Sequence, residues 1–117
     1  MSTIIYHNPR CTKSRLTLGI LEEKGVDFEV INYLDDTPTV DELKALLKDL
    51  NMNARALMRT HEAPYKDNNL ADESLSEDEL IQAMIDNPIL IERPIVRTER
   101  GVVIGRPPEN VLAIINP

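Results

Sequence analysis

The sequence predicts an α/β fold with a four-stranded sheet of mixed direction and a helical insertion. Three observations predict it: a strand, a helix and a strand follow one another within the first 33 residues, helical periodicity fills residues 36–87, and an antiparallel hairpin follows Pro88. A chain of 117 residues can bury one hydrophobic core. Residues 1–117 are therefore predicted to form a single domain.

The chain opens with a pattern typical of a βαβ unit. Thr3–His7 is a short apolar, β-branched run that Asn8-Pro9 ends, as expected of a buried strand. A second strand is predicted within residues 27–33, which include Phe28, Val30 and Ile31. Because a helix connects the two strands, we expect them to be parallel.

The connecting helix has start and stop signals. Thr12 or Ser14 is its predicted N-cap, and Lys24-Gly25 supplies a basic last turn and a glycine that ends it. The helix is predicted to face the core through Leu16, Ile20 and Leu21.

Two capping boxes predict helices in the middle of the chain, Thr39 with Glu42 and Ser76 with Glu79. Apolar residues follow both boxes at helical spacing. They are Val40, Leu43, Leu46, Leu47 and Leu50 after the first, and Leu80, Ile81, Met84 and Ile85 after the second. Asn87-Pro88 should end the second helix. A shorter helix is predicted within residues 53–60, and residues 62–74 are predicted to be irregular.

The last part of the chain changes to a strand pattern. Residues 95–98 and 102–105 flank a turn at Glu99-Arg100-Gly101, which predicts a hairpin. Pro107 and Pro108 are expected to begin a last helix that packs back onto the sheet. Its apolar residues are Val111, Leu112 and Ile115.

Composition excludes several classes of function. The formal net charge of −7 argues against nucleic acid as a partner, because phosphate backbones are bound by clustered Lys and Arg. No apolar run approaches the ~20 residues of a membrane helix, and the N-terminus does not resemble a secretory signal. We therefore expect a cytoplasmic protein without a membrane partner. With one cysteine and two histidines, His7 and His61, we expect no metal site.

The single cysteine lies in the one strongly basic stretch. Residues 7–16 contain Arg10, Lys13 and Arg15 and no acid, so they carry +3 while the rest of the chain carries −10. Cys11 falls just before the first predicted helix, where unpaired backbone N–H groups and the helix dipole can stabilise a thiolate. Arg10 or Lys13, together with His7, is expected to lower its pKa. The pattern predicts a reactive thiol.

A single thiol limits the reaction that Cys11 can complete. Cys11-Thr12-Lys13-Ser14 has the layout of a Cys-x-x-Cys motif with serine in the second place, so an external thiol must resolve any covalent intermediate. In a reducing cytoplasm that thiol is expected to be glutathione, with a glutaredoxin-like protein acting afterwards. Thr17 stands where a phosphatase loop of the Cys-x5-Arg type needs arginine, which argues against a phosphatase.

Four separated motifs resemble the glutaredoxin-coupled ArsC arsenate reductases, and the resemblance covers essentially the whole chain. The motifs are His7-Asn8-Pro9-Arg10-Cys11 with Ser14-Arg15, Arg55-Ala56-Leu57-Met58-Arg59, residues 87–96, and Gly105-Arg106-Pro107-Pro108. The resemblance implies a thioredoxin-like (glutaredoxin-like) fold, with Cys11 as the nucleophile. It also implies that the oxyanion is bound by Arg59, Arg93 and Arg106. The resemblance further implies supporting roles at the site for His7, Ser14, Arg15 and Pro94, with Pro94 as a cis-proline.

By this resemblance the enzyme reduces arsenate, or a similar oxyanion, through a thiol-arsenate intermediate on Cys11. Glutathione is the implied co-substrate and glutaredoxin the implied partner, with no tightly bound cofactor and a monomeric chain. Guanidinium groups suit a tetrahedral oxyanion because they offer paired donors and a permanent charge. The other arginines considered, Arg55, Arg97 and Arg100, are predicted to be surface charges.

Two alternatives stay open at this point. A general glutaredoxin-like thiol-disulfide reductase would use Cys11 but would not need three arginines at the thiol. A regulatory protein of the Spx kind, which shares the implied fold and contacts RNA polymerase, often carries a redox Cys-x-x-Cys, whereas this chain has Ser14 in the second place.

Overall fold

The computed structural model describes residues 3–115, which form two compact units. The first contains the described residues up to Asp36 and from Arg93 onward, and the second contains Thr37–Glu92. The second unit corresponds closely to the predicted helical insertion, about 36–87. The single-domain prediction for the whole chain stays a prediction. Within the described part of the chain, no helix is long and apolar enough to cross a membrane.

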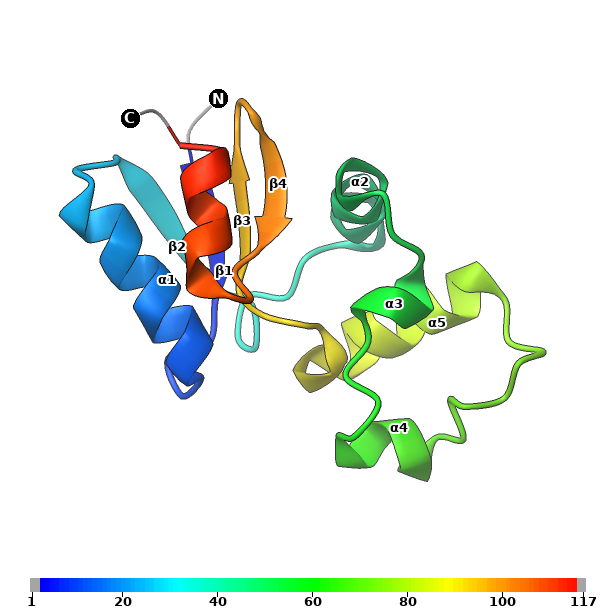
Figure 1. Cartoon of the computed structure of the whole chain (residues 1–117). Coiled ribbons are helices and arrows are strands. Elements are labelled where there is room, and N and C mark those ends of the chain that lie inside the picture. The colour runs from blue at the N-terminus through cyan, green and yellow to red at the C-terminus, as the bar shows by residue number, and fades with distance from the viewer. Residues whose placement is uncertain (1–2, 116–117) are drawn as a thin grey trace. The chain divides into compact units, whose positions relative to one another are not determined.

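The first unit is built on a four-stranded sheet in the order β2-β1-β3-β4 (Figure 1). The strands are β1 (Thr3–His7), β2 (Phe28–Asn32), β3 (Ile95–Thr98) and β4 (Gly101–Ile104). β1 runs parallel to β2 and antiparallel to β3, and β3 and β4 form an antiparallel hairpin. The predicted mixed four-stranded sheet is therefore confirmed.

Two helices share a core with this sheet, α1 (Thr12–Glu23) and the 3-10 helix η2 (Pro108–Ala113). Burying apolar side chains from both helices and from the central strands stabilises this unit. The buried core residues are Ile5, Leu21, Val96, Val111, Ile114 and Ile115. Val111 of the last helix and Ile115, which follows that helix, are buried in this core as predicted, but Leu112 is exposed.

The start and the core-facing side of α1 differ from the prediction. Cys11 occupies the N-cap position, so neither Thr12 nor Ser14 caps the helix. Leu16 is 53% exposed, while Ser14 and Thr17 are fully buried. These hydroxyls can be buried because each makes hydrogen bonds, which a pattern of apolar spacing does not reveal. α1 ends before Gly25 as predicted, with Gly25 in the left-handed region at φ 69°, but Lys24 is the C-cap and the last turn contains no basic residue.

The second unit is helical: α2 (Val40–Leu50), α3 (Ala54–Leu57), α4 (Ala63–Asp67), α5 (Glu77–Asp86) and the 3-10 helix η1 (Pro88–Leu90). Both predicted capping boxes are present. Its buried side chains include Leu43, Leu46, Leu47, Leu57, Leu80, Ile81, Met84 and Leu90. The prediction of an irregular 62–74 is wrong at α4, which buries no side chain and so leaves no apolar pattern to detect.

Gly105 allows three segments of the first unit to approach closely. A Cβ atom at this position would lie 2.5 Å from Thr17 Oγ1 and 2.8 Å from Pro94 Cγ, both shorter than real contacts allow. The Gly105 backbone N–H donates to Pro94 O at 2.9 Å. Any side chain here would push α1 or Pro94 away from the end of β4.

We therefore expect Gly105→Ala to lower the free energy of unfolding by about 1–3 kcal/mol through overpacking. Gly19→Ala is the matched control, because Gly19 lies inside α1 with nothing within 4 Å of the added methyl group. It should raise stability by about 0.5–1 kcal/mol through helix propensity. Urea unfolding of both variants measures the difference. Equal stabilities for the Gly105→Ala variant and the parent would contradict the close packing.

Candidate active site

The strand register brings three segments together at one end of the sheet. Tyr6 near the end of β1 pairs with Ile95 at the start of β3, and Ile95 pairs with Ile104 at the end of β4. The segments that continue from this row are the loop to Cys11, the Arg93-Pro94 dipeptide and the Gly105-Arg106 dipeptide. Residues far apart in the sequence therefore meet because of the antiparallel pairing.

Backbone hydrogen bonds fix Cys11 at the amino end of α1. Its N–H donates to Asn8 O at 3.0 Å, and its carbonyl accepts the Arg15 N–H at 3.0 Å. Asn8 is itself buried, and its Oδ1 accepts the Arg10 N–H at 3.0 Å. Cys11 is only 9% exposed. The sulfur is thus held in one place rather than on a loose loop.

Ser14 braces this loop from the first turn of α1. Its hydroxyl accepts the Asn8 backbone N–H at 3.0 Å and lies 2.7 Å from His7 Nδ1. Its backbone N–H also lowers the pKa of the Cys11 thiol. Arg15 adds a second brace, donating to Pro9 O at 2.9 Å and to Thr12 Oγ1 at 3.3 Å.

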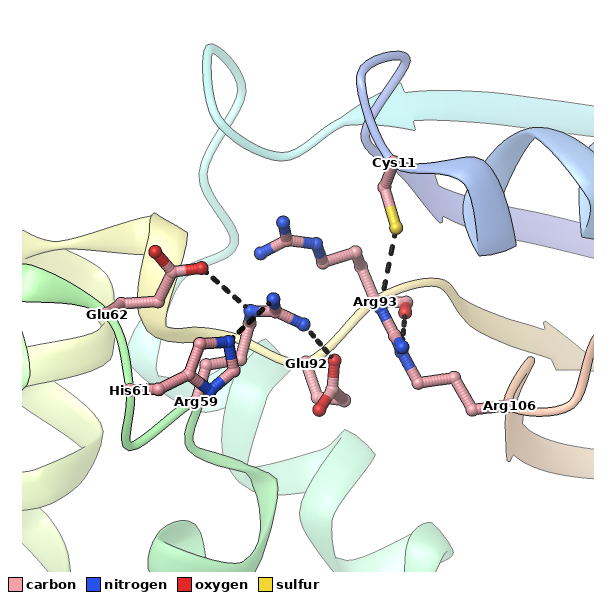
Figure 2. A network of polar contacts seen from close by, with 7 residues as sticks. All are labelled: Cys11, Arg59, His61, Glu62, Glu92, Arg93 and Arg106. Carbon is pink, nitrogen blue, oxygen red and sulfur yellow. Dashed lines mark hydrogen bonds and ion pairs between the residues drawn. The ribbon is translucent and has the colours of Figure 1, made fainter.

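Arg106 donates a hydrogen bond to the Cys11 sulfur, and Arg93 lies near enough to lower the pKa of the thiol. Arg106 Nη2 lies 3.4 Å from Sγ, and its Nε donates to Arg93 O at 2.8 Å, which orients the guanidinium group (Figure 2). Arg93 is 9% exposed, and its guanidinium group lowers the pKa of the Cys11 thiol. The Arg93–Pro94 peptide bond is cis, as the resemblance implied, and the Arg106–Pro107 bond is also cis.

These contacts change the acidity of the thiol. Burial raises the pKa of Cys11, but the Ser14 N–H, the Arg93 hydrogen bond and the charges of Arg93 and Arg106 together lower it below its ordinary value. The charges predicted to do this, Arg10 and Lys13, are on exposed side chains and are not among the causes. Thiolate stabilisation therefore comes from the first turn of α1 and from two arginines that only the fold brings near.

His7 is a neutral neighbour of the loop. Burial lowers its pKa, and the positive charge of Arg15 lowers it further. Since the ordinary histidine pKa is about 6.5, His7 is uncharged at neutral pH. It acts as a hydrogen-bond partner for Ser14 and, contrary to the prediction from the sequence, is not among the groups that lower the Cys11 pKa.

Arg59 lies in the second unit, where two carboxylates hold it. Nε donates to Glu62 Oε2 at 2.9 Å, Nη1 donates to Glu92 Oε1 at 2.6 Å, and Nη2 lies 3.1 Å from His61 Nε2 (Figure 2). Burial lowers the pKa of this guanidinium, but the two carboxylates raise it, so it stays charged. Its implied role in oxyanion binding stays a prediction. Any anion at Arg59 would compete with Glu62 and Glu92.

Arg55 is not the surface charge that was predicted. Its Nη1 donates to Tyr65 Oη at 2.8 Å and to Leu70 O at 2.7 Å, and its Nη2 donates to Asp72 O at 3.1 Å. It therefore ties α3 to the segment around α4, a role without any signal in local spacing. Arg100 is exposed as predicted, and Arg97 is half-buried.

The fold and the site define a thioredoxin-like protein with one acidic thiol flanked by arginines. Comparison with known proteins agrees: the ArsC family model matches residues 6–114, and the chain belongs to the ArsC family. The solved arsenate reductase from Vibrio cholerae superposes with a TM-score of 0.94 at 52% identity, covering 98% of both chains.

Two curated relatives extend this comparison along nearly the whole chain. The arsenate reductase of Haemophilus influenzae is 47% identical over 116 residues, covering 98% of this chain and 100% of that protein. The uncharacterized protein YfgD of Escherichia coli K12 is 59% identical over 112 residues, covering 95% and 94%. The chain is therefore similar both to proteins named arsenate reductase and to one without an assigned activity.

We expect the rate of Cys11 alkylation by iodoacetamide to reach half of its maximum at a lower pH than the rate for a free cysteine. The thiolate is the reactive form, and its fraction rises as the pH passes the thiol pKa. Arg106→Ala should move this midpoint to higher pH, because it removes a charge and a donor at the sulfur. Arg100→Ala, on an exposed arginine of the same unit, is the control and should leave it unchanged. A midpoint unaffected by Arg106→Ala would contradict the assignment.

Proposed function

We propose that this protein is an arsenate reductase in which Cys11 attacks the arsenic atom while Arg93 and Arg106 hold the oxyanion. The observation that carries the proposal is the meeting of two arginines, from the segments before β3 and after β4, at one sulfur. The names of the relatives support the same substrate.

The charge arrangement supports an oxyanion substrate over a neutral one. A guanidinium group offers planar N–H donors and a permanent charge, which match the oxygens of arsenate. Two such groups beside a thiolate would let a dianion approach a nucleophile that would otherwise repel it. A general thiol-disulfide reductase has no such requirement, so the arrangement favours the reductase of an oxyanion over that alternative.

The first step forms a bond between sulfur and arsenic. The Cys11 thiolate attacks As(V), and one arsenate oxygen leaves as water after protonation. The guanidinium groups stabilise the charge on the remaining oxygens. In this step no electrons are transferred to arsenic, so a reductant must follow.

The reductant must come from outside, because the chain has one cysteine. A glutathione thiol adds to the thiol-arsenate with loss of a second water. A glutaredoxin thiolate then attacks the glutathione sulfur, and the arsenic–sulfur electron pair stays on arsenic, giving As(III) and a glutaredoxin–glutathione disulfide. Hydrolysis of the remaining arsenic–sulfur bond releases arsenite and returns the Cys11 thiolate. Arg59 is proposed as a further anion ligand on the family resemblance alone.

A coupled assay tests this proposal. Purified protein is given arsenate, glutathione, glutaredoxin, glutathione reductase and NADPH, and NADPH consumption is followed. We expect consumption to require arsenate and to be lost in Cys11→Ser, since serine cannot form the intermediate at a useful rate. Equal consumption by the parent and the Cys11→Ser variant would end the proposal.

Arg106→Ala and Arg106→Lys separate anion binding from thiolate stabilisation. Both are assayed at a pH at which the thiol is ionised in each variant, so a loss reports the anion. We expect Arg106→Ala to lower kcat/KM for arsenate by roughly 10²–10³-fold. Arg106→Lys should lose less activity, because lysine keeps the positive charge but lacks the paired N–H donors of a guanidinium group. Arg100→Ala is the control. If Arg106→Ala kept full activity with arsenate, Arg106 would not be an oxyanion ligand.

A further inference from the structure

A hollow of about 340 Å³ adjoins the Cys11 loop in the first unit. We call it the loop pocket, and it is lined by Asn8, Pro9, Arg10, Asn32, Leu34 and Asp35. Three of these residues belong to the loop that leads directly into Cys11, and the others belong to the end of β2 and the turn after it. Its volume is at the small end of the ~300–1,000 Å³ range of small-molecule sites.

The charges of the loop pocket match an amino-acid group. Arg10 supplies one positive charge and Asp35 one negative charge, and neither side chain forms an ion pair among residues 3–115. The carboxylate of Asp35 makes the loop pocket less favourable for a simple anion. An α-ammonium together with an α-carboxylate would satisfy both lining charges.

An unsatisfied polar atom also points to a ligand. Asn32 Oδ1 is buried and has no hydrogen-bond partner among the described residues, although burying an acceptor without a donor costs free energy. Asn32 lines the loop pocket, and an ammonium group or an amide N–H of a ligand would reach this oxygen once the Asn32 side chain turns toward the pocket.

The backbone around the loop pocket is held in place, so the lining groups do not have to be ordered by the ligand. The Asn32 carbonyl accepts the N–H groups of Asp35 and Asp36 at 3.0 and 2.8 Å. On the other side, Asn8 Oδ1 accepts the Arg10 N–H at 3.0 Å. Arg10 also takes no part in lowering the Cys11 pKa, which leaves its charge without another assigned role.

We propose that the loop pocket binds the γ-glutamyl end of glutathione, with Asp35 facing its α-ammonium and Arg10 its α-carboxylate. The inference rests on the proposed function, which requires an external thiol at Cys11. Glutathione carries its ammonium and one carboxylate on the γ-glutamyl residue, several bonds from its sulfur. Seating that end beside the loop would leave the sulfur able to reach the thiol-arsenate on Cys11.

A second hollow of the same unit supplies matched controls. It also measures about 340 Å³, and its lining includes Lys24, Asp27, Glu99 and Arg100. It lies at the other end of the sheet, where β1 begins at Thr3, rather than beside the Cys11 loop. It therefore has a similar volume and a similar mixture of charges without the position that the proposal needs.

The test is a binding titration with S-methylglutathione, which has no reactive thiol, followed by amide chemical shifts of the protein. We expect shifts in residues of the loop pocket, and a dissociation constant roughly 2- to 10-fold larger in Arg10→Ala and in Asp35→Ala. Arg100→Ala and Asp27→Ala should bind as the parent does. S-methyl-N-acetylcysteine, which lacks the γ-glutamyl group, should bind the parent and the Arg10→Ala and Asp35→Ala variants equally weakly.

Three outcomes would overturn the proposal: no binding of S-methylglutathione, binding unaffected by both Arg10→Ala and Asp35→Ala, or equal losses in the Arg100→Ala and Asp27→Ala controls. The titration contains no arsenate and no turnover, so its result is independent of the coupled assay. Binding in the loop pocket without arsenate-dependent NADPH consumption would contradict the proposed function and leave the pocket assigned. Arsenate-dependent NADPH consumption without binding of S-methylglutathione in the loop pocket would support the proposed function and contradict the pocket assignment.

Discussion

The site depends on lowering the pKa of one buried thiol. Burial by itself raises the pKa of a thiol, and Cys11 is more than nine-tenths buried. The thiolate is favoured only because the Ser14 N–H and the guanidinium groups of Arg93 and Arg106 outweigh that cost. All of these groups belong to the first unit, which contains the sheet and its two helices. Every contact of the loop with Ser14 and Asn8 serves to hold the sulfur where those donors can reach it.

The close packing of α1 against the β3–β4 hairpin keeps the two arginines beside the sulfur. Arg93 and Arg106 flank the two ends of the β3–β4 hairpin, and the hydrogen bond from Arg106 Nε to Arg93 O joins them. Gly105 and Pro94 lie next to these arginines, and Thr17 of α1 fills the space that a side chain at Gly105 would need. Position 105 therefore requires a residue without a side chain, because the arginines keep their positions only if α1 and the hairpin approach closely.

Features of the structure that depend on neighbouring residues could be predicted from the sequence, whereas contacts between distant segments could not. The capping boxes at Thr39 and Ser76 and the glycine stop at Gly25 were read correctly, because each depends on residues within one or two helical turns. Cys11 could be singled out by its place between a strand and a helix. Arg93 and Arg106 could be chosen only by family resemblance, since their approach to Cys11 depends on strand register. Physical reasoning from charge instead favoured Arg10 and Lys13, which are near in sequence but exposed.

The same two arginines would have two tasks under the proposed function, and the tasks are in competition. In the free protein they stabilise the thiolate, and a thiolate stabilised in this way is a weaker nucleophile than its degree of ionisation suggests. When an oxyanion arrives, its oxygens attract the guanidinium donors more strongly than sulfur does, because oxygen is the better hydrogen-bond acceptor. The sulfur then loses part of its stabilisation beside the electrophile. Substrate binding would thus make the thiolate more reactive at the moment of attack, with the Ser14 N–H still holding it in place.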